Sequence, residues 1–197
     1  MAILAHAETR ILVQGITGRE AATFTAESIH YGARIVAGVT PGKRGADVHG
    51  VPVFDTVAQA TRHCPVDATI ISVPPAFVLD AVREALANGI RLLVVVTERI
   101  PRGDVAQMLR EASTAGARVV GPNSLGVITP GQTRIGMAGG SADAVRRAYM
   151  PGSVGVISRS GGMMTELANL LTQSGIGQST CVSIGGDPLI GSTALDL

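Results

Sequence analysis

The chain has 197 residues, 46% of them hydrophobic, which is enough for a buried core and excludes a disordered protein. A formal net charge of +1 argues against binding nucleic acid or a membrane surface through bulk charge, so any phosphate site must be local. The two cysteines, Cys64 and Cys181, fit neither a metal-ligand spacing nor a disulfide framework. No signal peptide or membrane-length apolar run is visible, and we expect a cytoplasmic protein with reduced thiols.

The first 124 residues alternate between β-branched apolar runs and segments of helical periodicity. The runs predict five strands, at residues 11–13, 34–39, 69–73, 91–96 and 118–120. The intervening segments predict helices at residues 19–31, 56–63, 77–86 and 105–112. This order is typical of an α/β fold with a doubly wound parallel sheet, here a Rossmann-like domain at residues 1–124. Right-handed crossovers bring the loops after the strands to one edge, where we expect the ligand.

Residues 125–150 lose this pattern and are rich in Gly, Pro, Thr, Gln and Ser. They predict an inter-domain crossover, with short extended pieces. A strand at 154–157, a helix with Met164 and Leu171 on one face, and a strand at 179–184 then form one βαβ unit within residues 151–197. One such unit cannot bury both faces of its sheet, so we expect the start of an incomplete second domain.

The turn after the first strand, Gly15-x-x-Gly18, suits an anion. Backbone N–H groups at a turn that opens a helix lack internal partners, and the helix dipole adds positive charge. A dinucleotide fingerprint would require a glycine in place of Ile16 and an acid after the second strand, which instead leads to Lys43. The pattern therefore disfavours NAD and favours another phosphate-rich nucleotide. The alternative is a tight turn beside a solvated lysine.

Residues 158–162 form a second candidate anion site, between a strand and a helix. Ser158, Ser160 and Gly161 place hydroxyls and a small residue at a helix N-terminus, where N–H groups are free. The spacing matches neither a P-loop nor a nucleophile elbow. An ordinary N-cap by either serine remains the alternative.

The histidines offer no catalytic or metal site. None pairs with a cysteine or an acid at metal-ligand or triad spacing, and two lie at predicted helix ends, where a cation complements the dipole. We therefore predict no catalytic residue and no metal ligand among His6, His30, His49 and His63.

Six short motifs follow one another along almost the whole chain. They are residues 14–18 (Gln-Gly-Ile-Thr-Gly), 38–43 (Gly-Val-Thr-Pro-Gly-Lys), 97–101 (Thr-Glu-Arg-Ile-Pro), 121–123 with 126–131, 158–161 (Ser-Arg-Ser-Gly), and 177–182 with 184–188. In this order and spacing, the chain closely resembles the α subunit of succinyl-CoA synthetase and related acid–CoA ligases. The resemblance implies a CoA-binding Rossmann-like domain followed by a flavodoxin-like α/β ligase domain.

The resemblance also implies residue roles. The implied coenzyme A contacts are Thr17, Gly18, Arg19 and Glu20 at the first turn, Lys43 at the phosphates, and Val96, Thr97 and Glu98 elsewhere on the cofactor. Members of this family join a carboxylic acid to CoA through an acyl phosphate and a phosphohistidine. A nucleotide-grasp β subunit binds ATP or GTP with Mg. The helix start at residues 158–161 resembles the family element whose dipole faces the phosphohistidine.

Three departures from the family pattern change what we expect. The phosphohistidine of the family lies beyond Leu197, so we expect this chain to be inactive alone. Ser124-Leu125 stand near the expected CoA thiol, where the family often has Cys-Pro. Thr165 replaces a substrate-contacting tyrosine of the succinate enzymes, which predicts a different or broader small carboxylic acid.

The leading hypothesis is an α-type subunit, or a fragment of one, of an acid–CoA ligase. A non-enzymatic CoA-binding module, regulatory or scaffolding, is the rival from another class. An NAD-linked oxidoreductase would require an acid near Val39 and has little support.

Overall fold

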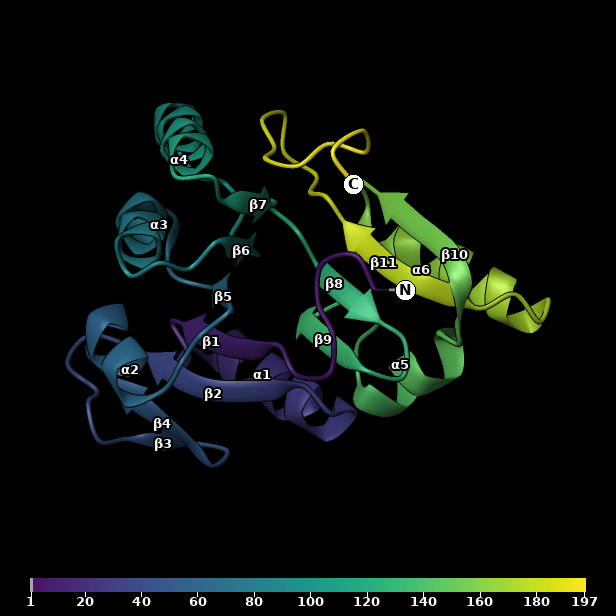
Figure 1. Ribbon diagram of the computed structural model, residues 1–197, viewed down its shortest axis with the longest axis horizontal. Helices are drawn as coiled ribbons and strands as arrows, with labels where there is room; N and C mark the ends of the chain where they lie inside the picture. Colours follow the sequence, from purple (N-terminus) through teal and green to yellow (C-terminus); the bar gives the residue numbers. More distant parts are fainter. Residues whose placement is uncertain (1) are drawn as a thin grey trace.

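The computed structural model describes residues 2–197 and contains two sheets (Figure 1). The larger has seven strands in the order β3-β4-β2-β1-β5-β6-β7, and all are parallel except β3. These strands are β1 (Arg10–Gln14), β2 (Arg34–Val39), β3 (Asp47–Val48), β4 (Val51–Phe54), β5 (Ala68–Ile71), β6 (Leu92–Val95) and β7 (Arg118–Val120). The helices between them are α1 (Arg19–Tyr31), α2 (Val57–His63), η1 (Pro75–Phe77), α3 (Val78–Ala87) and α4 (Arg102–Thr114). The predicted doubly wound α/β fold is confirmed.

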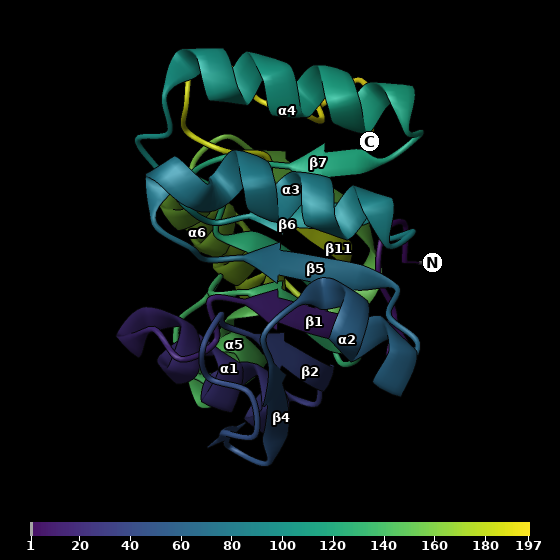
Figure 2. The same ribbon diagram turned by 90° about the vertical axis from the view of Figure 1, so that its left-hand side faces the viewer.

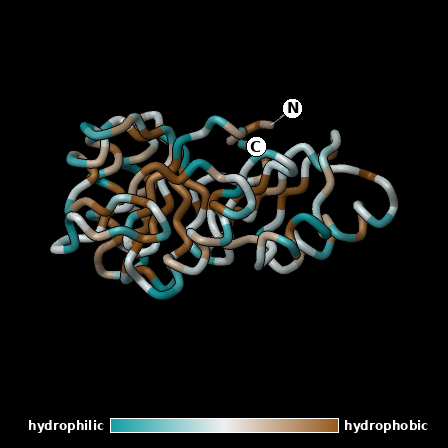
Figure 3. The backbone as a smooth tube through the Cα atoms, turned by 90° about the horizontal axis from the view of Figure 1, so that it is seen from below, coloured by the Kyte–Doolittle hydropathy of each residue, from teal (hydrophilic) through white to brown (hydrophobic). Residues whose placement is uncertain are grey.

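Alternate residues of β1 enter different cores on the two faces of this sheet. Leu12 packs with buried residues of α2, α3 and α4, which lie together on one face (Figure 2). Ile11 and Val13 pack on the other face, with Phe24 of α1. The hydropathy-coloured tube shows apolar segments gathered inside the molecule (Figure 3). Among residues 2–197, no helix combines the length and apolar character needed to cross a membrane.

The smaller sheet has four strands in the order β10-β11-β8-β9. Its strands are β8 (Gly126–Thr129), β9 (Thr133–Gly136), β10 (Pro151–Ser158) and β11 (Gln178–Ser183), and its helices are α5 (Ala142–Ala148) and α6 (Gly161–Gln173). β10 and β11 are parallel, as expected for a βαβ unit. The hairpin β8–β9 pairs antiparallel with β11, so residues 125–150 do more than cross between domains.

This second sheet packs on the face of the first sheet that α1 leaves open (Figure 1). Val127, Ile135 and Val182 are buried in the same cluster as Val13 and Val94. The start of the chain crosses to the second sheet before it enters β1. There the Thr129 hydroxyl donates to the Ala5 carbonyl at 2.7 Å, and the Ile3 amide donates to the Thr180 hydroxyl at 3.2 Å.

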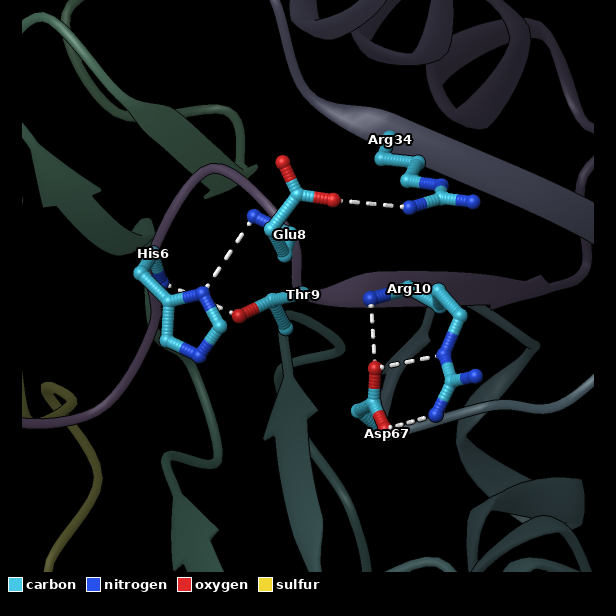
Figure 4. Close-up of polar contacts among 6 residues, drawn as sticks. All are labelled: His6, Glu8, Thr9, Arg10, Arg34 and Asp67. Carbon is cyan, nitrogen blue, oxygen red and sulfur yellow. Dashed lines mark hydrogen bonds and ion pairs between the residues drawn. The ribbon is translucent and has the colours of Figure 1, made fainter.

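A bidentate ion pair closes the amino end of β1 (Figure 4). Nε and Nη2 of Arg10 donate to the Asp67 carboxylate at 2.9 and 2.6 Å, and the Arg10 backbone amide donates to it at 2.8 Å. The Arg10 side chain lowers the pKa of Asp67 from its ordinary value of 3.8. The pair joins the starts of two neighbouring strands.

Replacing Asp67 with Asn should reduce stability at neutral pH. The Asp67 side chain is 40% exposed, so we expect a melting temperature lower by at most about 3 °C. Because the pKa of Asp67 is lowered by folding, its contribution is present above pH 3.8 and is lost as the pH falls through the lower folded pKa. Thermal unfolding at pH 7 and below pH 3 checks this. E8Q, which removes a single contact with Arg34, is the control.

Candidate functional site

The turn after β1 brings three strand ends into close contact. The Gly15 amide donates to the Val39 carbonyl at 2.7 Å, and Gly15 has a φ of 84°. A β-carbon on Gly15 would lie 2.2 Å from the Ser72 carbonyl oxygen. Both the left-handed backbone and the contact require glycine at this position.

The N-terminus of α1 has no side-chain cap. The N-cap residue is Gly18, which has no side chain that could accept a hydrogen bond. The backbone N–H groups of the first turn of α1 therefore remain available. The Thr17 hydroxyl lies 3.2 Å from that of Thr40, which ties this turn to the loop after β2. The uncapped helix start is compatible with the predicted anion site, which stays a prediction.

A cavity of about 700 Å³ lies beside this turn, at the carboxyl edge of the first sheet. Six of the predicted coenzyme A contacts line it: Gly18, Arg19, Glu20, Val96, Thr97 and Glu98. The Thr97 hydroxyl donates to the Val73 carbonyl at 2.8 Å, which holds the loop after β6 in place. Leu125 and Met137 also line the cavity, and the sequence did not indicate Met137 as a site residue.

Lys43 lies on an exposed loop after β2, outside the lining of that cavity. The Asp55 carboxylate accepts from the amides of Gly42 and Arg44 at 2.8 and 3.2 Å, so the loop itself is ordered. Within residues 2–197, the Lys43 side chain makes no hydrogen bond or ion pair. Its role as a phosphate contact stays a prediction.

A second cavity, of about 620 Å³, lies on the other side of the Gly15 turn. Its walls include Val39, Pro41, Val73 and Phe77. Phe77 matches the helical spacing of the buried face of α3, yet it lies in η1 and is 60% exposed. Sequence reasoning therefore missed an exposed aromatic ring in the lining of this cavity.

The N-terminus of α6 is capped from within. The Ser160 hydroxyl accepts from the Met163 amide at 3.3 Å, and the Ser158 hydroxyl donates to the Ser160 carbonyl at 2.9 Å. The guanidinium of Arg159 donates to the carbonyls of Gly186 and Asp187 at 3.4 and 2.5 Å. Ser160 is therefore an ordinary N-cap, which is the alternative that the sequence left open for this segment. The anion site at the same helix start stays a prediction.

Leu125 joins the first cavity to the start of α6. A β-carbon on Gly161 would lie 2.1 Å from Leu125 Cδ1 and 2.8 Å from Leu125 Cβ, so glycine is required for this contact. Leu125 also lines the cavity at the carboxyl edge. The two candidate sites that the sequence placed in separate domains therefore meet at one side chain.

Ser124 and Thr165, which depart from the family pattern, both form hydrogen bonds within the protein. The buried Ser124 hydroxyl donates to the Ser183 carbonyl at 2.5 Å and accepts from the Gly126 amide at 2.8 Å. The Thr165 hydroxyl lies 2.9 Å from the hydroxyl of Tyr149, whose pKa burial raises to about 12. Substrate contact by Thr165 stays a prediction.

None of the four histidines lines either cavity. His6 lies before β1, His49 between β3 and β4, and His30 and His63 near the ends of α1 and α2. Within residues 2–197, no cluster of His, Cys, Asp and Glu has the geometry of a metal site.

The fold and the glycine turn define a Rossmann-like domain with a cavity at the carboxyl edge of its sheet. Residues 6–99 match the CoA binding domain family. The whole chain is 44% identical to a succinate–CoA ligase [ADP-forming] α subunit of Archaeoglobus fulgidus and covers 67% of it. An Aquifex aeolicus α subunit is also 44% identical, with 63% covered. The chain belongs to the family of succinate–CoA ligase α subunits and spans about two thirds of their length.

Solved structures of other CoA enzymes share this fold. ATP citrate lyase of Methanosaeta concilii, in complex with (3S)-citryl-CoA, superposes with a TM-score of 0.87 at 27% identity, over 98% of this chain and 34% of that one. A dinucleotide-forming acetyl-coenzyme A synthetase of Ca. Korarchaeum cryptofilum gives 0.71 at 22% identity, over 97% of this chain and 41% of that one. The second likeness concerns the fold alone.

Replacing Gly15 with Ala should destabilise the protein by about 3 kcal/mol, because the variant adds both backbone strain and a steric clash. Gly42 also has a positive φ, of 76°, but its β-carbon would meet nothing within 4 Å. G42A is therefore the matched control and should lose only the backbone part. Urea unfolding of both variants measures the difference, and equal losses would show that the Ser72 contact is unimportant.

Proposed function

We propose that the chain is an α-type subunit of an acid–CoA ligase, which forms an acyl-CoA from a carboxylic acid, CoA and a nucleoside triphosphate. The junction at Leu125 is the observation that carries this proposal. There, the cavity expected to hold CoA meets the helix start expected to hold an anion. A thiol and an acyl phosphate must come together in this reaction, and the fold brings their two expected sites together.

In this proposal, CoA lies along the carboxyl edge of the first sheet. The first turn of α1 and Lys43 bind its phosphates, and residues 96–98 contact another part of the cofactor. The large cavity at this edge and the family match at residues 6–99 support this placement. The exposed ring of Phe77 offers a stacking surface in the adjoining cavity.

The phosphate would come to the α6 N-terminus, at Ser158, Ser160 and Gly161, on a histidine that none of the residues 2–197 supplies at this position. We propose that a nucleotide-grasp β subunit binds ATP or GTP with Mg and completes the enzyme. The α-subunit relatives support a partner of this kind. Residues 1–124 would act as the CoA-binding domain and residues 151–197 as the first part of the ligase domain, in the cytoplasm.

Replacing Lys43 with Ala should weaken CoA binding by roughly 1–3 kcal/mol if Lys43 pairs a phosphate. The variant should also lose any preference for CoA over dephospho-CoA. Isothermal titration measures both affinities. R44A removes the neighbouring exposed cation and should change binding less. Equal affinity of the unaltered chain for both ligands would contradict the role of Lys43, and no binding of CoA would contradict the proposed function.

The chain alone should remain unlabelled after incubation with ATP labelled on its terminal phosphate. The expectation follows because none of His6, His30, His49 and His63 lines the cavity at the carboxyl edge or lies within residues 158–161. Acid-labile, base-stable label on the chain, measured after gel separation, would show that one of these histidines accepts phosphate. A longer α subunit assayed with its β partner is the positive control.

A further inference from the structure

A third cavity, of about 360 Å³, lies between α1 and the loop that joins β9 to α5. One face of α1 forms its first wall, through Glu20, Thr23, Phe24 and Glu27. Met137 lies on the opposite wall. From Glu20 to Glu27 the helix rises about 10 Å, so the cavity is a groove that leads away from the sheet edge.

This groove adjoins the cavity at the carboxyl edge. Glu20 and Met137 line both of them. The Leu125 carbonyl accepts from the amides of Met137 and Ala138 at 3.0 and 2.9 Å. The wall between the two cavities is therefore attached to Leu125, the residue that also packs on the start of α6.

The groove carries negative charge on its accessible walls. Glu20 lies at its mouth, and the Glu27 carboxylate accepts from the Ala142 amide at 2.7 Å. The only cation in its lining, Arg134, is fully buried and forms no ion pair with any residue from 2 to 197. Two carboxylates would therefore repel an anionic group in the groove, and the guanidinium of Arg134 is buried.

Arg134 also fixes the shape of the groove. Its Nη1 donates to the carbonyls of Ala138 and Gly140 at 3.2 and 2.5 Å, and its Nε donates to the Ser28 hydroxyl at 3.2 Å. Its Nη2 is buried and has no acceptor among the described residues. These bonds fix the β9–α5 loop relative to α1, so the groove is preformed.

We propose that this groove receives the carbon tail of the acyl group, and that the acid is a monocarboxylic acid with an uncharged tail. The inference rests on the function proposed above, since it assumes a CoA thiol near Leu125. Met137 and the accessible edge of Phe24, which is only 4% exposed, supply the apolar contacts, and Glu20 with Glu27 disfavour a second carboxylate. The substrate class therefore differs from that of a ligase for a dicarboxylic acid such as succinate.

Isothermal titration of the chain with CoA, hexanoyl-CoA and succinyl-CoA tests this inference. Hexanoyl-CoA should bind more tightly than CoA, by up to about fourfold for each methylene that becomes buried. Succinyl-CoA should bind no more tightly than CoA. If CoA binds and hexanoyl-CoA shows no gain, the groove is not an acyl site while the proposed function stands. If CoA does not bind, the proposed function fails first.

A matched pair of variants locates the effect. T23W places a large ring in the groove, and T114W makes the same change on α4, where Thr114 donates to the carbonyl four residues earlier as Thr23 does. T23W should reduce the affinity for hexanoyl-CoA to that for CoA, whereas T114W should keep the gain. Loss of the gain in both variants, or in neither, would overturn the assignment to this groove.

Discussion

The apolar contact between the two sheets determines how the site is assembled. Val13 and Val94 of the first sheet share one buried cluster with Val127, Ile135 and Val182 of the second. This contact lies on the face opposite α2, α3 and α4, and it fixes the second sheet and α6 relative to the first sheet. The ligand cavity and the α6 N-terminus then meet at Leu125 without a flexible connection.

Five of the parallel strands could be predicted from the sequence because each reads as an aliphatic run between helical segments. The run in β6, Leu92–Val95, is an example. The pair β3–β4 was missed because it is short, contains Pro52 and lies at the sheet edge. The hairpin β8–β9 was missed because Gly126 and Gly136 pair across it, and a β-carbon on Gly126 would lie 1.9 Å from the Ile135 oxygen. The glycines of this segment allow two backbones to lie close together, although a glycine-rich composition is also typical of a linker.

The turn at Gly15 could be predicted because its backbone conformation allows only glycine, and a glycine is visible in the sequence. Apolar site residues were harder to predict. Phe77 continues the spacing of a buried helix face, and Met137 follows a strand that the sequence did not indicate. Whether Thr165 can meet a substrate depends on Tyr149, which reaches it from another element and cannot be inferred from local sequence.

The crossing of the chain's first residues to the second sheet bears on how the molecule unfolds. Ile3 and Ala5 are bonded to Thr180 and Thr129, which come from two strands of that sheet. A cut after residue 124 would remove these partners from the start of the chain and expose the part of that face of the first sheet that α1 does not cover. In the uncut chain, we therefore expect the two sheets to unfold together as one cooperative unit. A domain boundary that is visible in the sequence need not separate two independently stable parts.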